Sequence, residues 1–394
     1  MQIEDLNILF AQHPEIALAR REMGKGKGIH LLLSGLHASA RAFALAQLRA
    51  SLFIIMDNGE AAQYLYGDLR SLLPPSPEGK GEVYFFPSSI RRRTTDEAMA
   101  IQRTETLGAL MRADKNSIVV TYPEAIVESV PSPKTLEKSS MTLRVGQEIP
   151  HSELSRKLTE LGFEHVDFVF QPGQYAIRGS IVDIYSYSHD IPYRLDFFGD
   201  EIDSIREFDI EDQLSKTKVE EAEIIGQSSE AGDQPSASII DYLNDEFIWV
   251  SNEWSVVKYK LEGLGVTGDG LQERRTIEMA EKSYFPTHSK IAFDTLPQPV
   301  FHKQFDLLTE DIQKHQEEGY KIYILAEQKK QLDRLQAILG EDIFIPINAT
   351  IHEGFVDKGL KICCYTDHQI FERFHRVRVS SENARRGKAI ITLR

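Results

Sequence analysis

The stretch SGLHASARAF, residues 34–43, lies where a phosphate-binding loop would be expected. It follows the apolar run IHLLL (29–33), which is typical of a buried strand, and it leads into ARAFALAQLRA, whose pattern is helical. A strand, a glycine-containing loop and a helix form the setting of the G-x-x-x-x-G-K-[ST] motif. In that motif backbone N–H groups surround the phosphates, the lysine reaches the outer phosphates and the hydroxyl group binds Mg²⁺. The chemistry that this stretch could perform is therefore nucleotide binding.

The loop lacks most of the groups which that chemistry requires. Gly35 retains the first glycine, but Ala40 replaces the second, Arg41 stands at the lysine position and Ala42 at the hydroxyl position. Ala40 restricts the backbone, and Ala42 has no oxygen for a metal ion. The wide, planar guanidinium of Arg41 is a poor substitute for a compact ammonium group. An eroded phosphate site and an ordinary strand-to-helix turn both remain open, and both predict that ATP is not hydrolysed here.

A second position of phosphate chemistry is altered in the same way. The buried strand in FIWVSNEWS (247–255) is followed by Asn252 and Glu253, where ATPases of the helicase type have Asp-Glu. That pair holds Mg²⁺ and activates water, and an amide is a poorer Mg²⁺ ligand than a carboxylate. Two altered positions in one chain indicate a domain that retained a fold and lost a reaction.

Composition and charge narrow the function classes. The chain has 394 residues and a formal net charge of −15. Its length predicts two to four domains, because single cores stop growing near ~250–300 residues. The negative charge disfavours non-specific DNA binding, which depends on neutralising phosphates. One basic cluster, Arg91, Arg92 and Arg93, is interpreted as a solvated loop rather than a nucleic-acid contact.

The location of the protein is also predicted from simple features. The N-terminus has no basic region of a secretory signal, and no apolar run approaches the ~20 residues that span a bilayer. Cys363 and Cys364 are adjacent in a strand-like run, so they are expected on opposite faces as reduced core residues. These features predict a cytoplasmic protein.

The pattern of apolar residues changes along the chain. Residues 1–130 alternate apolar strands with helical patterns, which predicts βαβ units and a parallel sheet. Alternating β-rich segments follow one helical stretch at 152–163, and they predict an antiparallel α+β module. After a polar linker at 226–238 the α/β pattern resumes. The predicted fold class is therefore α/β: a P-loop-NTPase-like parallel-sheet domain (1–140 and 212–298), an inserted α+β domain (141–211) and a small C-terminal α/β domain (299–394).

The β-rich module contains two recurring motifs. They are IRGSIVDIY (177–185) and RLDFFGDEI (194–202), and LRVGQEI (143–149) precedes them. These motifs resemble the second domain of UvrB, a bacterial excision-repair protein. The same module occurs near the N-terminus of the transcription-repair coupling factors, which are longer bacterial ATPases. The nucleotide motifs of their first domain are degenerate, so the loop at 35–42 favours the coupling factors over UvrB.

Two further stretches are similar to the coupling factors. They are FFPSSIRRRT…IQRTETL (85–107) and FDTLPQPVFHKQFDLL (293–308). The polymerase-binding and translocase domains of that family have no match in this chain. The resemblance therefore implies an N-terminal fragment, composed of the UvrB-like module and a third domain.

The resemblance also implies a function. It is a non-catalytic module that recruits UvrA, the damage-recognition ATPase, to stalled RNA polymerase in transcription-coupled nucleotide excision repair. RNA polymerase and DNA are expected to bind through domains absent from this chain, and no cofactor, metal, membrane or small-molecule substrate is expected. The UvrA-binding residues carried over from the family motifs are Arg178, Arg194, Asp196 and Phe198.

The residues themselves support that surface. Alternation within RLDFF places Arg194, Asp196 and Phe198 on one strand face and Leu195 and Phe197 on the other. Leu195 and Phe197 are expected to face the core, and arginine and exposed aromatic residues are typical of interface hot spots. A cross-strand ion pair beside an incidental aromatic residue is the alternative interpretation.

Two enzymatic hypotheses compete with the binding module. An ATP-dependent, UvrB-like DNA-handling enzyme would need the lysine, the Asp-Glu pair and an aromatic hairpin, for which the loop at 74–81 is too short. A metal hydrolase would use His352, Glu353, Asp367, His368 and the two cysteines, but their spacing matches no standard zinc pattern.

Overall fold

The computed structural model describes residues 2–73, 82–91, 94–95, 97–112, 116–189, 191–226, 236–264, 270–340 and 342–373. Within this range the chain divides into two compact units. The described parts of 2–85, 116–124 and 244–373 form the first unit, and those of 86–112 and 125–243 form the second. Arg92, Arg93 and the side chain of Arg91 lie outside the described residues, as do the loop at 74–81 and most of the linker at 226–238.

The first unit is built on a parallel sheet of seven strands, in the order β19-β1-β18-β17-β2-β6-β3. Every residue of β1, β2, β6 and β17 is buried, which explains why these strands are continuous apolar runs. The strands are β1 (His30–Ser34), β2 (Leu52–Ile55), β3 (Val83–Phe85), β6 (Ile118–Thr121), β17 (Ile248–Ser251), β18 (Thr276–Glu278) and β19 (Ser289–Ala292).

The helices of this sheet begin at local signals in the sequence. Pro14 opens α2, where its fixed φ suits the first helical position. Asn58 caps α4, because its side-chain oxygen accepts a hydrogen bond of 2.9 Å from the N–H of Ala61. The helices are α1 (Ile3–Phe10), α2 (Pro14–Met23), α3 (Ala40–Ala46), α4 (Gly59–Leu72), α6 (Pro123–Ile126), α9 (Trp254–Gly263) and the 3₁₀ turn η2 (Leu271–Glu273).

The first unit also contains a five-stranded sheet, in the order β20-β23-β24-β21-β22. β24, β21 and β22 are parallel, whereas β23 runs antiparallel to β20 and β24. The strands are β20 (Thr295–Pro297), β21 (Lys321–Leu325), β22 (Ile345–Ile347), β23 (Phe355–Asp357) and β24 (Ile362–Thr366). The helices are α10 (Phe305–Glu317), α11 (Lys329–Leu339) and α12 (Asp367–Ile370).

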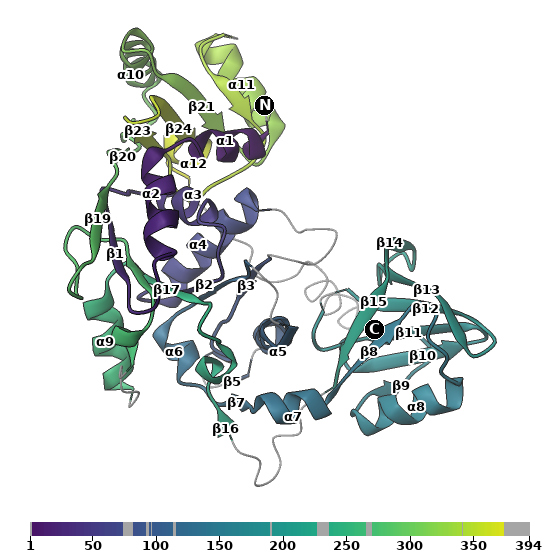
Figure 1. Cartoon of the computed structure of the whole chain (residues 1–394). Coiled ribbons are helices and arrows are strands. Elements are labelled where there is room, and N and C mark those ends of the chain that lie inside the picture. Colours follow the sequence, from purple (N-terminus) through teal and green to yellow (C-terminus); the bar gives the residue numbers. More distant parts are fainter. Residues whose placement is uncertain are drawn as a thin grey trace. The chain divides into compact units, whose positions relative to one another are not determined.

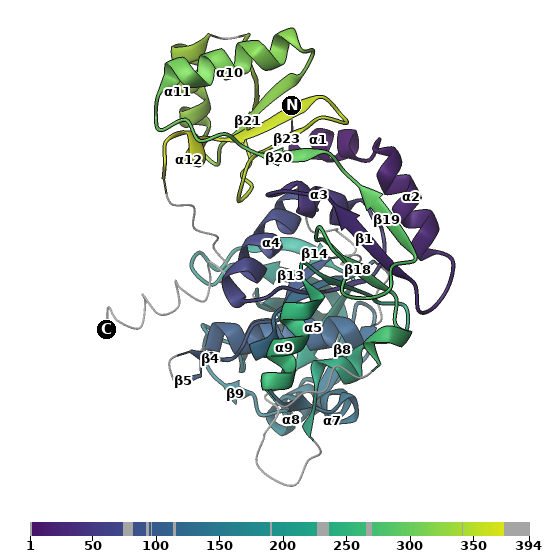
Figure 2. The same cartoon turned by 90° about the vertical axis from the view of Figure 1, so that its left-hand side faces the viewer.

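The two sheets of the first unit share one hydrophobic core. α10 and α11 pack on one face of the five-stranded sheet, with Cys363 of β24 (Figure 2). Cys364, on the opposite face, belongs to the core that contains Phe10 of α1 and Phe43 of α3. Both cysteines are buried and free, so their predicted placement is confirmed.

The second unit contains a six-stranded sheet in the order β14-β13-β12-β11-β10-β9 (Figure 1). All neighbours are antiparallel except β9 and β10. The strands are β9 (Glu164–His165), β10 (Gln174–Arg178), β11 (Ile181–Tyr185), β12 (Tyr193–Phe198), β13 (Glu201–Phe208) and β14 (Ser215–Val219).

The two faces of this sheet are covered differently. Leu154 and Leu158 of α8 (His151–Glu160) pack into the large core on one face, together with residues of β8 (Ser140–Arg144) and β15 (Glu221–Ile225). The other face carries a smaller apolar cluster around Phe208.

The remaining elements of the second unit are short strands and helices outside this sheet. They are β4 (Ile90–Arg91), β5 (Thr94–Thr95), α5 (Glu97–Arg112), β7 (Val130–Pro131), α7 (Pro133–Lys138), β16 (Ser236–Ala237) and the 3₁₀ turn η1 (Ile239–Tyr242).

The predicted fold class is confirmed: a parallel α/β sheet, an antiparallel α+β module and a smaller C-terminal α/β sheet. The exact domain boundaries remain a prediction. No helix among the described residues is long and apolar enough to cross a membrane.

Candidate functional site

The loop at 35–39 follows β1, as the sequence predicts, and its glycine has a structural reason. Gly35 has a φ of +71°, and a Cβ atom at this position would lie 2.0 Å from the carbonyl oxygen of Phe293. Both the left-handed backbone and the close approach require glycine. Gly35 is therefore explained by packing against the segment that follows β19.

Three backbone N–H groups of this loop bond to acceptors of the protein itself. The N–H of Gly35 donates to the carboxylate of Glu281 (3.2 Å), and that of His37 donates to the hydroxyl of Thr295 (2.9 Å). The N–H of Ser39 donates to the carbonyl oxygen of Glu353 (3.3 Å). A phosphate-binding loop works by leaving such groups free to converge on an anion. Here they are occupied by acceptors of the same chain.

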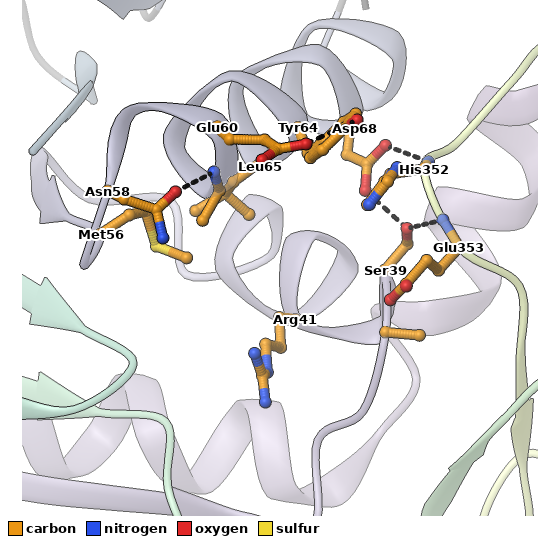
Figure 3. A pocket seen from close by; sticks show the side chains of 12 residues that line it. Ser39, Arg41, Met56, Asn58, Glu60, Tyr64, Leu65, Asp68, His352 and Glu353 are labelled. Atoms are coloured by element: carbon orange, nitrogen blue, oxygen red, sulfur yellow. Dashed lines mark hydrogen bonds between the residues drawn. The ribbon is translucent and has the colours of Figure 1, made fainter. Parts of the chain in front are cut away.

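Ala40, Arg41 and Ala42 do not supply the groups that a phosphate site needs. Ala40 and Ala42 are fully buried in α3. Arg41 donates from Nε to the carbonyl oxygen of Leu36 (3.1 Å), and burial lowers the pKa of its guanidinium. In Figure 3 its side chain points away from Ser39 and Asp68.

A pocket of about 310 Å³ lies beside this loop, and His352 and Glu353, from the segment between β22 and β23, line one side of it (Figure 3). Asp68 of α4 accepts hydrogen bonds from the hydroxyl of Ser39 (2.5 Å) and from the N–H of His352 (2.6 Å). The N–H of Glu353 in turn donates to the Ser39 hydroxyl (2.9 Å). The ring of His352 stacks on Tyr64, with centroids 3.4 Å apart. Burial raises the pKa of Asp68 to about 7 despite its hydrogen bonds.

The Asn252–Glu253 pair lies apart from this pocket. β18 separates β17, which ends at Ser251, from β1, and neither residue lines the pocket. The side-chain oxygen of Asn252 is buried and has no hydrogen-bond partner among the residues that the structure describes. Glu253 accepts a hydrogen bond from the hydroxyl of Ser255 (3.0 Å). The two altered nucleotide positions therefore follow parallel strands of one sheet that are separated by β18.

The residues considered for a metal site come from two neighbouring segments, and Nε2 of His368 lies 2.8 Å from the carbonyl oxygen of His352. His352 and Glu353 line the pocket, whereas Asp367 and His368 belong to α12. Within the described part of the chain, no group of three or more His, Cys, Asp and Glu side chains is arranged to hold a metal ion.

The second candidate site lies on the sheet of the second unit. Leu195 and Phe197 of β12 are buried, whereas Arg194 and Asp196 are half-buried and Phe198 is 84% exposed. This is the alternation that the sequence predicts. The three motif residues of β12 therefore share the face opposite α8.

Two arginines on that face converge on one buried carboxylate, and we call Arg178, Asp183 and Arg194 the Asp183 cluster. Asp183 lies opposite Arg194 in the register of β11 and β12. Arg194 donates to it from Nε (2.7 Å) and Nη2 (2.9 Å), and Arg178 forms a further ion pair with the same carboxylate. Asp183 is completely buried, and its hydrogen bond raises the pKa of Arg194.

Further contacts fix both arginines. Arg194 donates to the carbonyl oxygen of Gln213 (2.8 Å), and its guanidinium lies 4.2 Å from the ring centroid of Phe208. Asp196 instead pairs with Arg206 of β13, at 3.2 Å. Arg178 and Arg194 thus belong to the Asp183 cluster, whereas Asp196 belongs to a separate ion pair. Sequence reasoning missed Asp183, although its position in IVDIY, on the strand face opposite Val182 and Ile184, was a usable signal.

Comparisons with known proteins agree with this fold. Residues 141–229 match the family model of the UvrB interaction domain, and this match identifies the class of the antiparallel module. Over most of its length the chain is similar to transcription-repair-coupling factors. The resemblance to the N-terminal region of these proteins, predicted from the sequence, is confirmed.

Three curated relatives illustrate the extent of the similarity, and all are named transcription-repair-coupling factor. The protein of Bacillus subtilis is 36% identical over 188 residues, which cover 47% of this chain and 16% of the relative. The Staphylococcus aureus protein is 23% identical and the Staphylococcus epidermidis protein 24% identical, covering 86% and 84% of this chain. The matched region spans only 38% and 36% of those two relatives.

Proposed function

We propose that this chain is a non-catalytic module that recruits UvrA to stalled RNA polymerase in transcription-coupled nucleotide excision repair. The observation that carries the proposal is Phe198, an almost fully exposed aromatic side chain on the same strand face as the Asp183 cluster. Contact with RNA polymerase and DNA is assigned to other regions of a longer protein.

The contacts of the arginines favour a preformed binding surface. Arg178 and Arg194 are held by a buried carboxylate, so they lose little conformational freedom when a partner binds. The predicted alternative, an ion pair beside an incidental aromatic residue, is present in part as the pair of Arg194 and Asp183. The exposure of Phe198 on the same face as two fixed arginines favours the binding function, because aromatic residues and arginine are enriched in interface hot spots.

The contacts of the loop at 35–39 support the non-catalytic part of the proposal. Three of its N–H groups bond to protein acceptors, and Arg41 cannot replace the lysine of a phosphate site. A UvrB-like, ATP-dependent enzyme would need those groups free.

The proposal is tested by capture of purified UvrA on the immobilised 394-residue chain, with an ATPase assay on the chain alone. We expect UvrA to be retained by the wild-type chain and lost with Phe198→Ala, and no ATP turnover. Tyr259→Ala is the matched control, because Tyr259 is an exposed aromatic residue of the first unit. Retention of UvrA by the Phe198→Ala variant at the wild-type level would contradict the proposal.

A further inference from the structure

Four large hydrophobic side chains are exposed in the described part of 141–226, and we call them the hydrophobic rim. Phe168 is 49% exposed, Phe170 45%, Phe198 84% and Leu214 64%. Only Phe198 belongs to the recurring motifs of the sequence. The other three come from the segment before β10 and from the turn between β13 and β14.

Arg178 holds the segment before β10. Its Nη1 donates to the carbonyl oxygen of Asp167 (3.3 Å), and its guanidinium lies 4.5 Å from the ring centroid of Phe168. The N–H of Phe170 is fixed by the side-chain oxygen of Gln174 (3.0 Å). The position of both aromatic residues therefore depends on contacts with β10.

Arg194 holds the turn between β13 and β14 in the same way. It donates to the carbonyl oxygen of Gln213, the residue directly before Leu214. Gln213 has a φ of +59°, and its side-chain amide donates to the carbonyl oxygen of Ile210 (2.9 Å). The N–H of Leu214 bonds to Asp212 (2.8 Å). This turn is therefore a fixed structure that presents Leu214 to solvent.

The carboxylate of Asp183 links the segment before β10 with the turn between β13 and β14. Asp183 binds Arg178 and Arg194 together, so it orients both segments although it is completely buried. Exposed apolar side chains around fixed arginines are the composition that binding hot spots favour. They fit an apolar partner surface, and they flank the arginines on the strand face that carries Phe198.

We propose that the UvrA-binding surface extends beyond the motif residues to Phe168, Phe170 and Leu214, and that Asp183 is the residue that positions them. This inference rests on the proposed function, because UvrA is the occupant to which it commits. Asp183 does not contact UvrA itself, because it is completely buried. It acts only through Arg178 and Arg194.

The extension of the surface is tested by UvrA affinity, measured by isothermal titration calorimetry on the full chain. We expect Phe168→Ala and Leu214→Ala each to weaken binding about tenfold or more, as truncation of a central interface residue does. Phe168→Leu should lose less, because it retains apolar contact with Arg178. Phe198→Ala is measured in parallel, Tyr259→Ala is the control, and thermal unfolding checks that each variant is folded.

The outcomes separate the two ideas. If Phe198→Ala weakens binding but Phe168→Ala, Phe170→Ala and Leu214→Ala stay within twofold of the wild type, the extension is wrong and the proposed function stands. If Phe198→Ala also binds like the wild type, the proposed function fails and the extension fails with it.

The positioning role of Asp183 needs a separate measurement. Asp183→Asn retains the shape of the side chain and removes its charge. We expect faster amide hydrogen exchange at 166–171 and 211–214, unchanged protection of the amides of α8, and weaker UvrA binding. Unchanged exchange in both segments, or faster exchange throughout the unit, would overturn the positioning role.

Discussion

At the residue scale, the structure gives Arg194 a role in stabilising the fold. It shares the carboxylate of Asp183 with Arg178, and Asp183 is completely buried. Removing one partner of a buried pair costs up to ~3–5 kcal/mol when no other partner remains. Because Arg178 stays in place, we expect Arg194→Ala to lower the free energy of unfolding by ~1–3 kcal/mol.

Urea unfolding of the full chain, followed by fluorescence, measures this change. Arg206→Ala is the matched control, because the pair of Arg206 and Asp196 is partly exposed and worth about 0–1 kcal/mol. Equal losses for the two variants would contradict the importance of the buried carboxylate.

The same strand shows what the sequence could and could not predict. Alternation fixed the faces of Leu195 and Phe198, because a strand places successive side chains on opposite sides. The partner of Arg194 was not predictable from alternation alone, because the choice between Asp183 and Asp196 depends on the register of two neighbouring strands. The rim residues Phe168 and Leu214 were missed because they lie outside regular strands, where no periodicity applies.

At the element scale, the segment around His352 and Glu353 forms hydrogen bonds with polar side chains that line the pocket. It connects β22 and β23, and its N–H groups bond to Asp68 and Ser39. These partners are 284 and 314 residues apart in the sequence, so no local pattern could indicate them. The sequence predicted the strand, the loop and the helix, but not that the same chain would occupy the loop's N–H groups.

The raised pKa of Asp68 predicts a pH dependence of stability. Its folded pKa is about 7, against 3.8 ordinarily, so between these values the folded chain binds a proton that the unfolded chain has released. The stability contribution of Asp68 is therefore lost as pH rises through this window, by up to ~1.4 kcal/mol per pH unit. The carboxylate of Glu353 faces the same site and acts in the same direction.

Asp68→Asn removes this titration while retaining the shape of the side chain. We expect the variant's free energy of unfolding, relative to the wild type, to increase between about pH 4 and about pH 7 and to level off above. A difference between Asp68→Asn and the wild type that does not change with pH would contradict the buried, protonated carboxyl group.

At the scale of the whole molecule, the first unit has the parallel sheet and the strand, loop and helix order of a nucleotide-binding domain. Glu281, Thr295 and Glu353, however, accept hydrogen bonds from the N–H groups that phosphates would need. We therefore expect isothermal titration of Mg-ATP into the chain to give no heat of binding. A micromolar dissociation constant would contradict this expectation and favour the UvrB-like enzyme.

We propose above all that the exposed face of the second unit binds UvrA. The most direct measurement is the dissociation constant of UvrA with the wild-type chain and with Phe198→Ala, determined by titration calorimetry. A hot-spot truncation costs ~2 kcal/mol or more, so we expect the variant to bind at least about thirtyfold more weakly while Tyr259→Ala binds like the wild type. Equal dissociation constants for the wild type and Phe198→Ala would contradict the account.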